Sequence, residues 1–126
     1  MSILQILNKN DGSVIYEKDV PTMKECVNSA ITDGVGLINA DLSTQDLDSC
    51  VFLRGNCTWA DLSGATLTSA NFDQCNLYEA VLTGADLTGA DFTRANLQGV
   101  TLTAAQLGSL GSELTAHQMG QVTIVD

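Results

Sequence analysis

The chain has 126 residues, 44% of them hydrophobic and 5% aromatic, and this length fits one domain. Fifteen acidic residues against five basic ones give a formal charge of −10. That charge argues against nucleic acid or an anionic membrane as a direct partner, because both attract positive charge. No run of eighteen apolar residues and no basic, apolar leader is present, so we expect no membrane span and a cytoplasmic location.

The first third of the chain predicts a β-hairpin followed by a helix. Residues 3–7 and 14–17 are apolar segments, and the turn formers between them end in Asp11-Gly12. Thr22 and Glu25 form a capping box, and apolar residues then recur at helical spacing until Gly34. The apolar stripe consists of Met23, Cys26, Val27, Ala30 and Ile31. We expect this helix to cover the open start of the segment that follows.

Residues 40–109 divide into fourteen consecutive blocks of five without an insertion. The third position is Leu or Phe in thirteen blocks, with Cys57 as the exception, and the first position is Ala in nine. The second position favours Asp or Asn, and the fourth favours Ser or Thr. A period of five fits neither a helix nor a plain strand. It predicts a chain that turns a corner every five residues, with the first and third side chains of each block turned inward.

A second period of twenty residues supports four corners per coil. Identical residues recur at this spacing or at its double, and we expect each set to stack on one face of the coil, as side chains do in cross-β ladders. These sets are Phe52, Phe72 and Phe92, which form a core ladder, then Asn56, Asn76 and Asn96, and finally Arg54 and Arg94. Gln45, Gly55 and Cys57 depart from the pattern and predict a less regular first coil.

The blocks resemble the pentapeptide repeat family, whose consensus is A-(D/N)-L-(S/T)-X. The resemblance implies an all-β, right-handed quadrilateral β-helix with the first and third positions inside. A hairpin and helix at the front also resemble some bacterial and phage members. We predict one compact domain made of an N-terminal hairpin and capping helix over 1–34, a solenoid over 35–109, and a cap with a terminal strand over 110–126. The family carries no catalytic residues, so the resemblance implies none here.

After Ser109 the five-residue register fades. Residues 110–119 are compatible with a short helix or an irregular cap, and residues 121–125 predict a strand. This strand has three possible partners: the last coil, the N-terminal hairpin or a neighbouring subunit. Its β-branched composition argues against a free tail, and we favour pairing within the chain or at a subunit edge.

Candidate residues for catalysis or metal binding are scarce. His117 is the single histidine and lies outside the repeats. The four cysteines, at positions 26, 50, 57 and 75, match no zinc or redox spacing, and we interpret them as small buried hydrophobes. The sequence therefore predicts a protein that is not an enzyme and has no cofactor and no metal.

Acidic residues suggest one kind of surface. Asp41 and Asp61 are expected to stack on one face of the coil, and Asp46 and Asp86 on the next. Pentapeptide proteins of the quinolone-resistance type are thought to imitate DNA against type II topoisomerases, and the resemblance implies the same alternative here. The other interpretation is a solvated surface that resists aggregation. Fourteen blocks give a rod of about 17 Å, the length of about five base pairs.

Apolar residues at outward positions suggest a second kind of surface. They are Val51, Leu53, Trp59, Tyr78 and Val81. Either they form a patch that contacts a protein partner, or the N-terminal hairpin folds back over them. Our leading hypothesis is a non-enzymatic interaction or structural module that binds a protein or self-assembles, within a larger assembly such as a phage particle. The alternative is an acidic DNA mimic that inhibits a topoisomerase or another DNA-binding protein.

Overall fold

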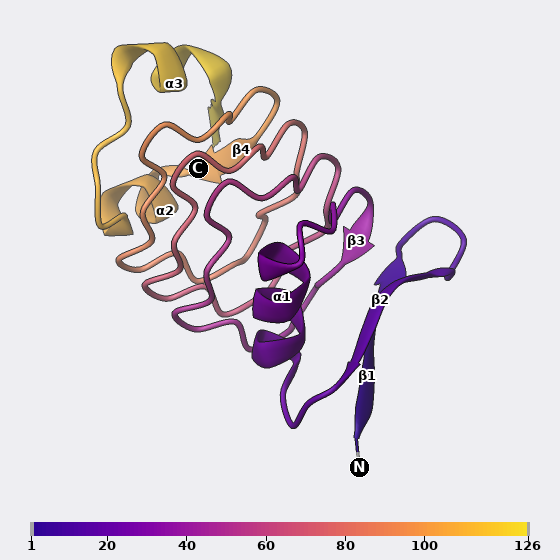
Figure 1. Cartoon of the computed structure of the whole chain (residues 1–126). Helices are drawn as coiled ribbons and strands as arrows, with labels where there is room; N and C mark the ends of the chain where they lie inside the picture. The colour runs from indigo at the N-terminus through magenta and orange to yellow at the C-terminus, as the bar shows by residue number, and fades with distance from the viewer. Residues whose placement is uncertain (1, 126) are drawn as a thin grey trace.

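The computed structural model describes residues 2–125 as a stack of coils, with a hairpin and a helix at one end and two short helices at the other (Figure 1). Met1 and Asp126, the outer limits of the two predicted end segments, lie outside the described residues. The elements are β1 Ile3–Asn8, β2 Val14–Asp19, α1 Met23–Thr32, β3 Ala40–Asp41, β4 Thr101–Thr103, α2 Ala104–Ser109, α3 Ala116–Gln121 and β5 Thr123–Val125. Within residues 2–125 no helix is long and apolar enough to cross a membrane.

Parallel bridges between residues twenty apart hold the coils together. Asp41 pairs with Asp61 in this way: the Leu42 N–H donates to the Asp61 carbonyl at 2.8 Å, and the Asp61 N–H donates to the Ala40 carbonyl at 2.9 Å. The same pairing joins Asp46 to Thr66, Val51 to Asn71, Asn56 to Asn76, and each of these columns continues into the next coil. The predicted period of twenty is therefore confirmed, and the chain is a β-helix solenoid.

A tight turn ends every side of the coil. In each one the first residue of a block donates its N–H to the carbonyl three residues earlier, as Ala60 does to Cys57 at 3.0 Å. The fifth residue of a block, which directly precedes this N–H donor, has a positive φ, and the value at Trp59 is 60°. This combination defines a type II turn. Four of the thirteen turn positions from 39 to 99 are glycine and nine are not, so the chain accepts a cost of about 1 kcal/mol at each of these nine.

The polar second position of each block has a local role in the turn. Asp61 Oδ1 accepts hydrogen bonds from the backbone N–H of Ser63 at 2.9 Å and from its hydroxyl at 2.6 Å. The same Asx turn forms at Asp41, Asn56, Asp86 and Asp91. Asp or Asn at the second position and Ser or Thr at the fourth thus recur because together they close the corner.

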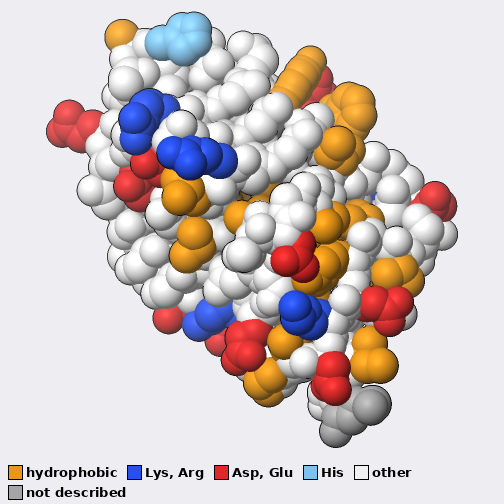
Figure 2. Space-filling view, viewed as in Figure 1, with side chains coloured by type: hydrophobic (Ala, Val, Ile, Leu, Met, Phe, Trp, Pro, Cys, Tyr) orange, Lys and Arg blue, Asp and Glu red, His pale blue; other side chains and the backbone are white. Residues whose placement is uncertain are grey.

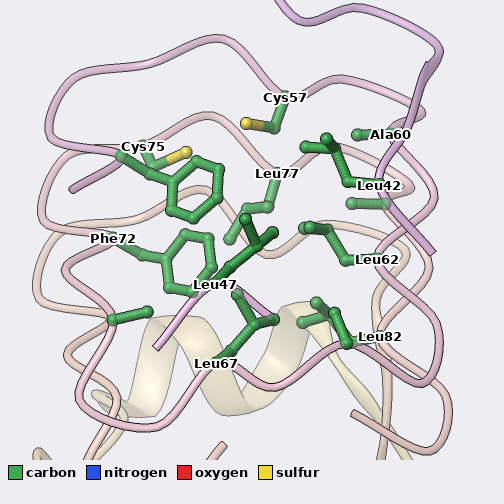
Figure 3. Close-up of a cluster of buried hydrophobic side chains, with 14 of the residues drawn as sticks. Leu42, Leu47, Cys57, Ala60, Leu62, Leu67, Phe72, Cys75, Leu77 and Leu82 are labelled. Atoms are coloured by element: carbon green, nitrogen blue, oxygen red, sulfur yellow. The ribbon is translucent and has the colours of Figure 1, made fainter. Parts of the chain in front are cut away.

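Large third-position side chains fill the interior, and small first-position residues leave room for them. Figure 3 shows Leu42, Leu62 and Leu82 in one column pointing into this core. The Phe52 and Phe72 rings stack with centroids 4.6 Å apart and planes 8° apart, and Phe72 and Phe92 stack at 4.9 Å and 2°. The predicted Phe ladder is confirmed.

The block 35–39 is part of the solenoid, and the solenoid ends one block earlier than the sequence predicted. Leu37 is fully buried, and its N–H donates to the Asn56 carbonyl as a regular rung. The prediction of a regular block over residues 105–109 was wrong, because α2 already begins at Ala104. There Gln106 is buried although its position predicts exposure, and Leu107 is only partly buried. Fourteen blocks are therefore present, over residues 35–104.

The N-terminal elements pack on the first coil. Strand β1 pairs antiparallel with both β2 and β3, so the hairpin extends one side of the solenoid. In α1, the Thr22 hydroxyl accepts from the Glu25 N–H at 3.2 Å, and Gly34 has the expected left-handed conformation with φ 74°. Cys26, Val27 and Ala30 are buried in the same core as the coils.

Contacts of α1 explain why the first coil departs from the consensus. The Asn28 Oδ1 atom accepts the backbone N–H of Val51 at 2.9 Å. A Cβ atom at Gly55 would lie 2.7 Å from Ile31 Cδ1 and 3.0 Å from the Phe52 carbonyl oxygen, so any larger residue there would require the Ile31 side chain to shift. The helix and the hairpin thus lie against the open first coil. That they prevent other chains from pairing with this end of the solenoid remains a prediction.

Two similar segments close the last coil. A short helix in residues 110–119 was one predicted alternative, but the two capping boxes were not predicted. Thr103-Ala-Ala-Gln106 and Thr115-Ala-His-Gln118 each form a capping box that opens a six-residue helix. Gln106 Nε2 donates to the carbonyls of Leu82 and Ala85 at 2.8 and 3.0 Å. Gln118 Nε2 donates to the carbonyls of Phe92 and Ala95 at 2.8 and 3.1 Å. In a regular coil the carbonyl of the first residue of a block accepts the N–H of the residue 21 positions later, as Ala65 does from Asp86 at 3.0 Å. The glutamine amides replace this donor at Ala85 and Ala95.

The terminal strand β5 pairs parallel with β4. Of the three alternatives for this strand, the structure shows pairing on the last coil. The all-β expectation was too narrow, because α2 and α3 at the C-terminal end join the predicted N-terminal helix α1, and the coil sides are mostly isolated bridges. Right-handed winding remains a prediction.

The Phe ladder makes a direct prediction about stability. Replacing Phe72 with Ala leaves a cavity between two stacked rings and is expected to lower the free energy of unfolding by about 3–5 kcal/mol. Chemical denaturation would measure this loss, with Asn71→Ser as the mild control on the same side of the coil. A loss below about 1 kcal/mol for Phe72→Ala would contradict the packing.

The C-terminal helices make a second prediction. Gln118→Glu keeps the side-chain shape but loses the donor, and it places a carboxylate against two carbonyls. We expect a loss of about 1–3 kcal/mol in the free energy of unfolding and faster amide hydrogen exchange across residues 93–122. The exposed Gln98→Glu is the matched control, and equal effects from the two variants would contradict the capping role.

Candidate interaction surface

An aromatic pair stands on one corner of the solenoid. Trp59 occupies the fifth position of one coil and Tyr78 the fourth position of the next, and the Trp59 N–H donates to the Tyr78 carbonyl at 2.9 Å. Their rings meet edge to face, with centroids 6.5 Å apart and planes 64° apart. The Trp59 side chain is 45% exposed. The structure therefore brings together two of the predicted surface residues.

Two exposed apolar side chains lie in the outward columns next to this corner. Val81 is the first outward residue around the corner from Tyr78 and is 37% exposed. Ile38 occupies the same fourth-position column as Tyr78, two coils earlier, and is 41% exposed. Sequence reasoning missed Ile38, although counting residues 35–39 as a full block would have found it. We call Ile38, Trp59, Tyr78 and Val81 the aromatic corner.

Val51 and Leu53 lie on a different side of the coil. They belong to the side that carries the Phe ladder, whereas Trp59 ends the following side. Val51 is exposed and Leu53 is partly buried, and Asn28 of α1 contacts the Val51 backbone. Figure 2 shows exposed hydrophobic side chains in separate small groups with polar surface between them. The five predicted surface residues thus belong to two areas of the solenoid, and the hairpin leaves Trp59 and Val51 exposed.

Negative charge surrounds the aromatic corner. Glu79 follows Tyr78 and lies one coil beyond Trp59, in the same fifth-position column. Interaction with the Glu79 carboxylate raises the pKa of the Tyr78 hydroxyl. Asp61 pairs with Val81 across the adjoining side. The three outward columns that meet at this corner contain no Lys or Arg: Ile38, Thr58, Tyr78, Gln98; Asn39, Trp59, Glu79, Gly99; Asp41, Asp61, Val81, Thr101.

The predicted acidic faces are present but locally engaged. Asp41 and Asp61 stack directly, whereas Thr66 separates Asp46 from Asp86. The Thr88 hydroxyl and backbone N–H hydrogen-bond the Asp86 carboxylate and lower the pKa of Asp86. These carboxylates serve the turns described above, so a structural reason already accounts for their positions.

The cysteines are buried in the core. Burial raises the pKa of Cys50 to about 12, with a smaller contribution from nearby Cys57. The raised pKa keeps the thiol protonated and unreactive near neutral pH. Within residues 2–125, no group of three or more His, Cys, Asp or Glu side chains is placed to hold a metal ion.

A groove of about 570 Å³ runs between α3 and the corner at Arg94. Arg94, Glu113 and His117 contribute its charged or titratable side chains. Arg94 already pairs with Asp73 at 2.9 Å, and Gln118 donates to backbone carbonyls. Most polar groups of the groove are thus engaged within the chain.

Comparison with known proteins identifies the repeats. The family model described as pentapeptide repeats matches residues 56–94 and 75–108. No curated protein is a significant match. A solved pentapeptide repeat protein from the thylakoid lumen of Arabidopsis thaliana is 38% identical, with a TM-score of 0.52, over 52% of this chain and 46% of that one.

Two solved proteins of the cyanobacterium Nostoc also match, with low structural overlap. One is a pentapeptide repeat protein involved in heterocyst differentiation regulation, at 36% identity and TM-score 0.22, over 53% of this chain and 36% of that one. The other pentapeptide repeat protein is 18% identical with TM-score 0.27, over 86% of this chain and 99% of that one. The chain spans less than half the length of the Arabidopsis protein and of the first Nostoc protein.

Trp59 offers a test that separates the surface from the fold. Its φ of 60° is the conformation that glycine adopts at equivalent corners. We expect Trp59→Gly to stay within about 1 kcal/mol of the native stability, because relief of the left-handed cost offsets the lost contact with Tyr78. Trp59→Ala should be less stable than Trp59→Gly by about 1 kcal/mol. Ser69→Gly, at another corner, is the control in the same denaturation series. A loss above about 2 kcal/mol for Trp59→Gly would make Trp59 a structural residue.

Proposed function

The chain belongs to the pentapeptide repeat family over residues 56–108, and we propose that it is a non-enzymatic interaction module that contacts a protein through the aromatic corner. The observation that carries this proposal is the preformed pair of an exposed Trp59 and a partly buried Tyr78 on a rigid solenoid. Tyrosine and tryptophan supply most of the binding energy at many protein interfaces. A surface set on stacked rungs also loses little conformational entropy when it binds.

The acidic surface supports the DNA-mimic alternative less well. Asp41, Asp61 and Asp86 accept hydrogen bonds from their own turns. Val81 and Thr66 interrupt the two acidic columns. A mimic of DNA needs a regular row of negative charges, so the break at Thr66 and the end of the other row at Val81 favour the aromatic corner as the contact surface. A cytoplasmic location and a place in a larger assembly such as a phage particle remain predictions.

Differential retention tests the proposed function. The native protein, Trp59→Gly and Ser69→Gly would be immobilised at equal density and exposed to extract of the cells that encode the chain. We expect one protein to be retained by the native chain and by Ser69→Gly, and retention to fall at least about tenfold with Trp59→Gly, a loss of about 1.4 kcal/mol. Retention that is unchanged by Trp59→Gly, or absent for all three, would contradict the proposal.

A further inference from the structure

We propose that the partner segment for the aromatic corner is cationic: a peptide stretch that places an arginine or lysine next to an apolar side chain. This inference rests on the proposed function and adds the chemistry of the partner. It follows from the arrangement of aromatic rings, apolar side chains and carboxylates around one corner of the solenoid.

The aromatic rings provide the first argument. A cation is attracted to the face of an aromatic ring, and tryptophan gives the strongest attraction of the natural side chains. Tyr78 meets Trp59 edge to face, and 45% of Trp59 remains exposed, so ring surface is available to a ligand. Val81 and Ile38 flank the pair and can contact the apolar neighbour of the cation.

Charge provides the second argument. Glu79 follows Tyr78 and lies one coil beyond Trp59, Asp61 lies on the adjoining side, and the three columns at this corner carry acidic residues but no basic ones. The Lys9 backbone N–H donates to the Asn39 carbonyl at 2.8 Å, which places the nearest lysine backbone at the first rung of the corner. A cation of the partner is therefore favoured on the Glu79 side of Trp59. The opposite side of Trp59, near Lys9, is expected to make apolar contacts.

Other occupants fit less well. A second copy of the chain would bring the same net charge of −10 and would be repelled at low salt. Nucleic acid is repelled for the same reason. A cationic protein segment is attracted by both the local and the overall charge, which also speeds its association.

The single tryptophan makes the binding directly visible. Because Trp59 is the only tryptophan, its fluorescence reports on this corner alone. The probe is an amidated, acetylated twelve-residue peptide of alternating arginine, leucine and serine. Its matched control contains citrulline in place of arginine, which keeps the side-chain shape and removes the charge. We expect the arginine peptide to change Trp59 emission saturably and to bind about tenfold more tightly than the citrulline peptide.

Variants locate the charge effect. Glu79→Gln combined with Asp61→Asn removes two carboxylates at the corner, and asparagine can still accept the turn hydrogen bonds from Ser63. Asp46→Asn combined with Asp86→Asn makes the same change in net charge on the next face. We expect the first pair to weaken arginine-peptide binding at least about threefold and the second pair to change it less than about twofold at 0.15 M salt.

Each result has a definite meaning. Equal affinity for the arginine and citrulline peptides, equal effects of the two variant pairs, or no change in Trp59 emission with either peptide would overturn the cationic partner. If retention of a cellular protein still depends on Trp59 in that case, the interaction module stands and its partner binds by apolar contact. If the peptide results are as expected but retention does not depend on Trp59, the corner binds cations and the proposed function fails.

Discussion

The type II turn that closes every five residues is the constraint on which the rest of the structure depends. It places the fifth residue at positive φ and turns the chain so that residues twenty apart pair along each side. Single turns of this kind are marginal, and nine of the corner positions carry side chains that disfavour the conformation. The stacked hydrogen bonds and the buried Leu and Phe columns outweigh that cost only because each rung has a neighbour.

Dependence on neighbours makes the two ends the difficult parts of the molecule. A rung without a neighbour exposes backbone donors and acceptors together with the apolar interior. At the start, β1 continues one side and α1 covers the core with Cys26, Val27 and Ala30. At the other end, Gln106 and Gln118 donate their side-chain amides to the Ala85 and Ala95 carbonyls, which have no backbone donor from a further rung. Among the described residues, no buried side-chain nitrogen or oxygen is left without a hydrogen-bond partner.

The sequence predicted those features that recur and failed at those that occur once or twice. The repeat of five and the Phe ladder were readable because each appears on several coils. Residues 35–39 were predicted only as a degenerate entry block, because Val35 and Gly36 replace the consensus Ala and Asp. Gln106 was predicted to point outward because the five-residue register, extended to residues 105–109, gives it a second position. In the structure it instead forms the capping box that opens α2. The motif Thr-Ala-x-Gln occurs at 103–106 and at 115–118, and this repeated motif could have predicted the two capping boxes at the C-terminal end.

The candidate site was predictable in its residues but not in its grouping. Outward positions follow from the register, so Trp59, Tyr78 and Val81 could be chosen from the sequence. Which of these side chains meet depends on the corner geometry. Val51 and Leu53 lie together on the side of the coil that precedes the side ending at Trp59.

The turn geometry also explains why acidic residues occupy the second position of the blocks. A carboxylate at the second position is required by its own turn and carries little information about a partner. Trp59 and Glu79 occupy fifth positions, where glycine would be less strained, and no turn contact in the structure requires an aromatic or acidic side chain there. Side chains that the fold does not need are the ones whose chemistry points to a partner.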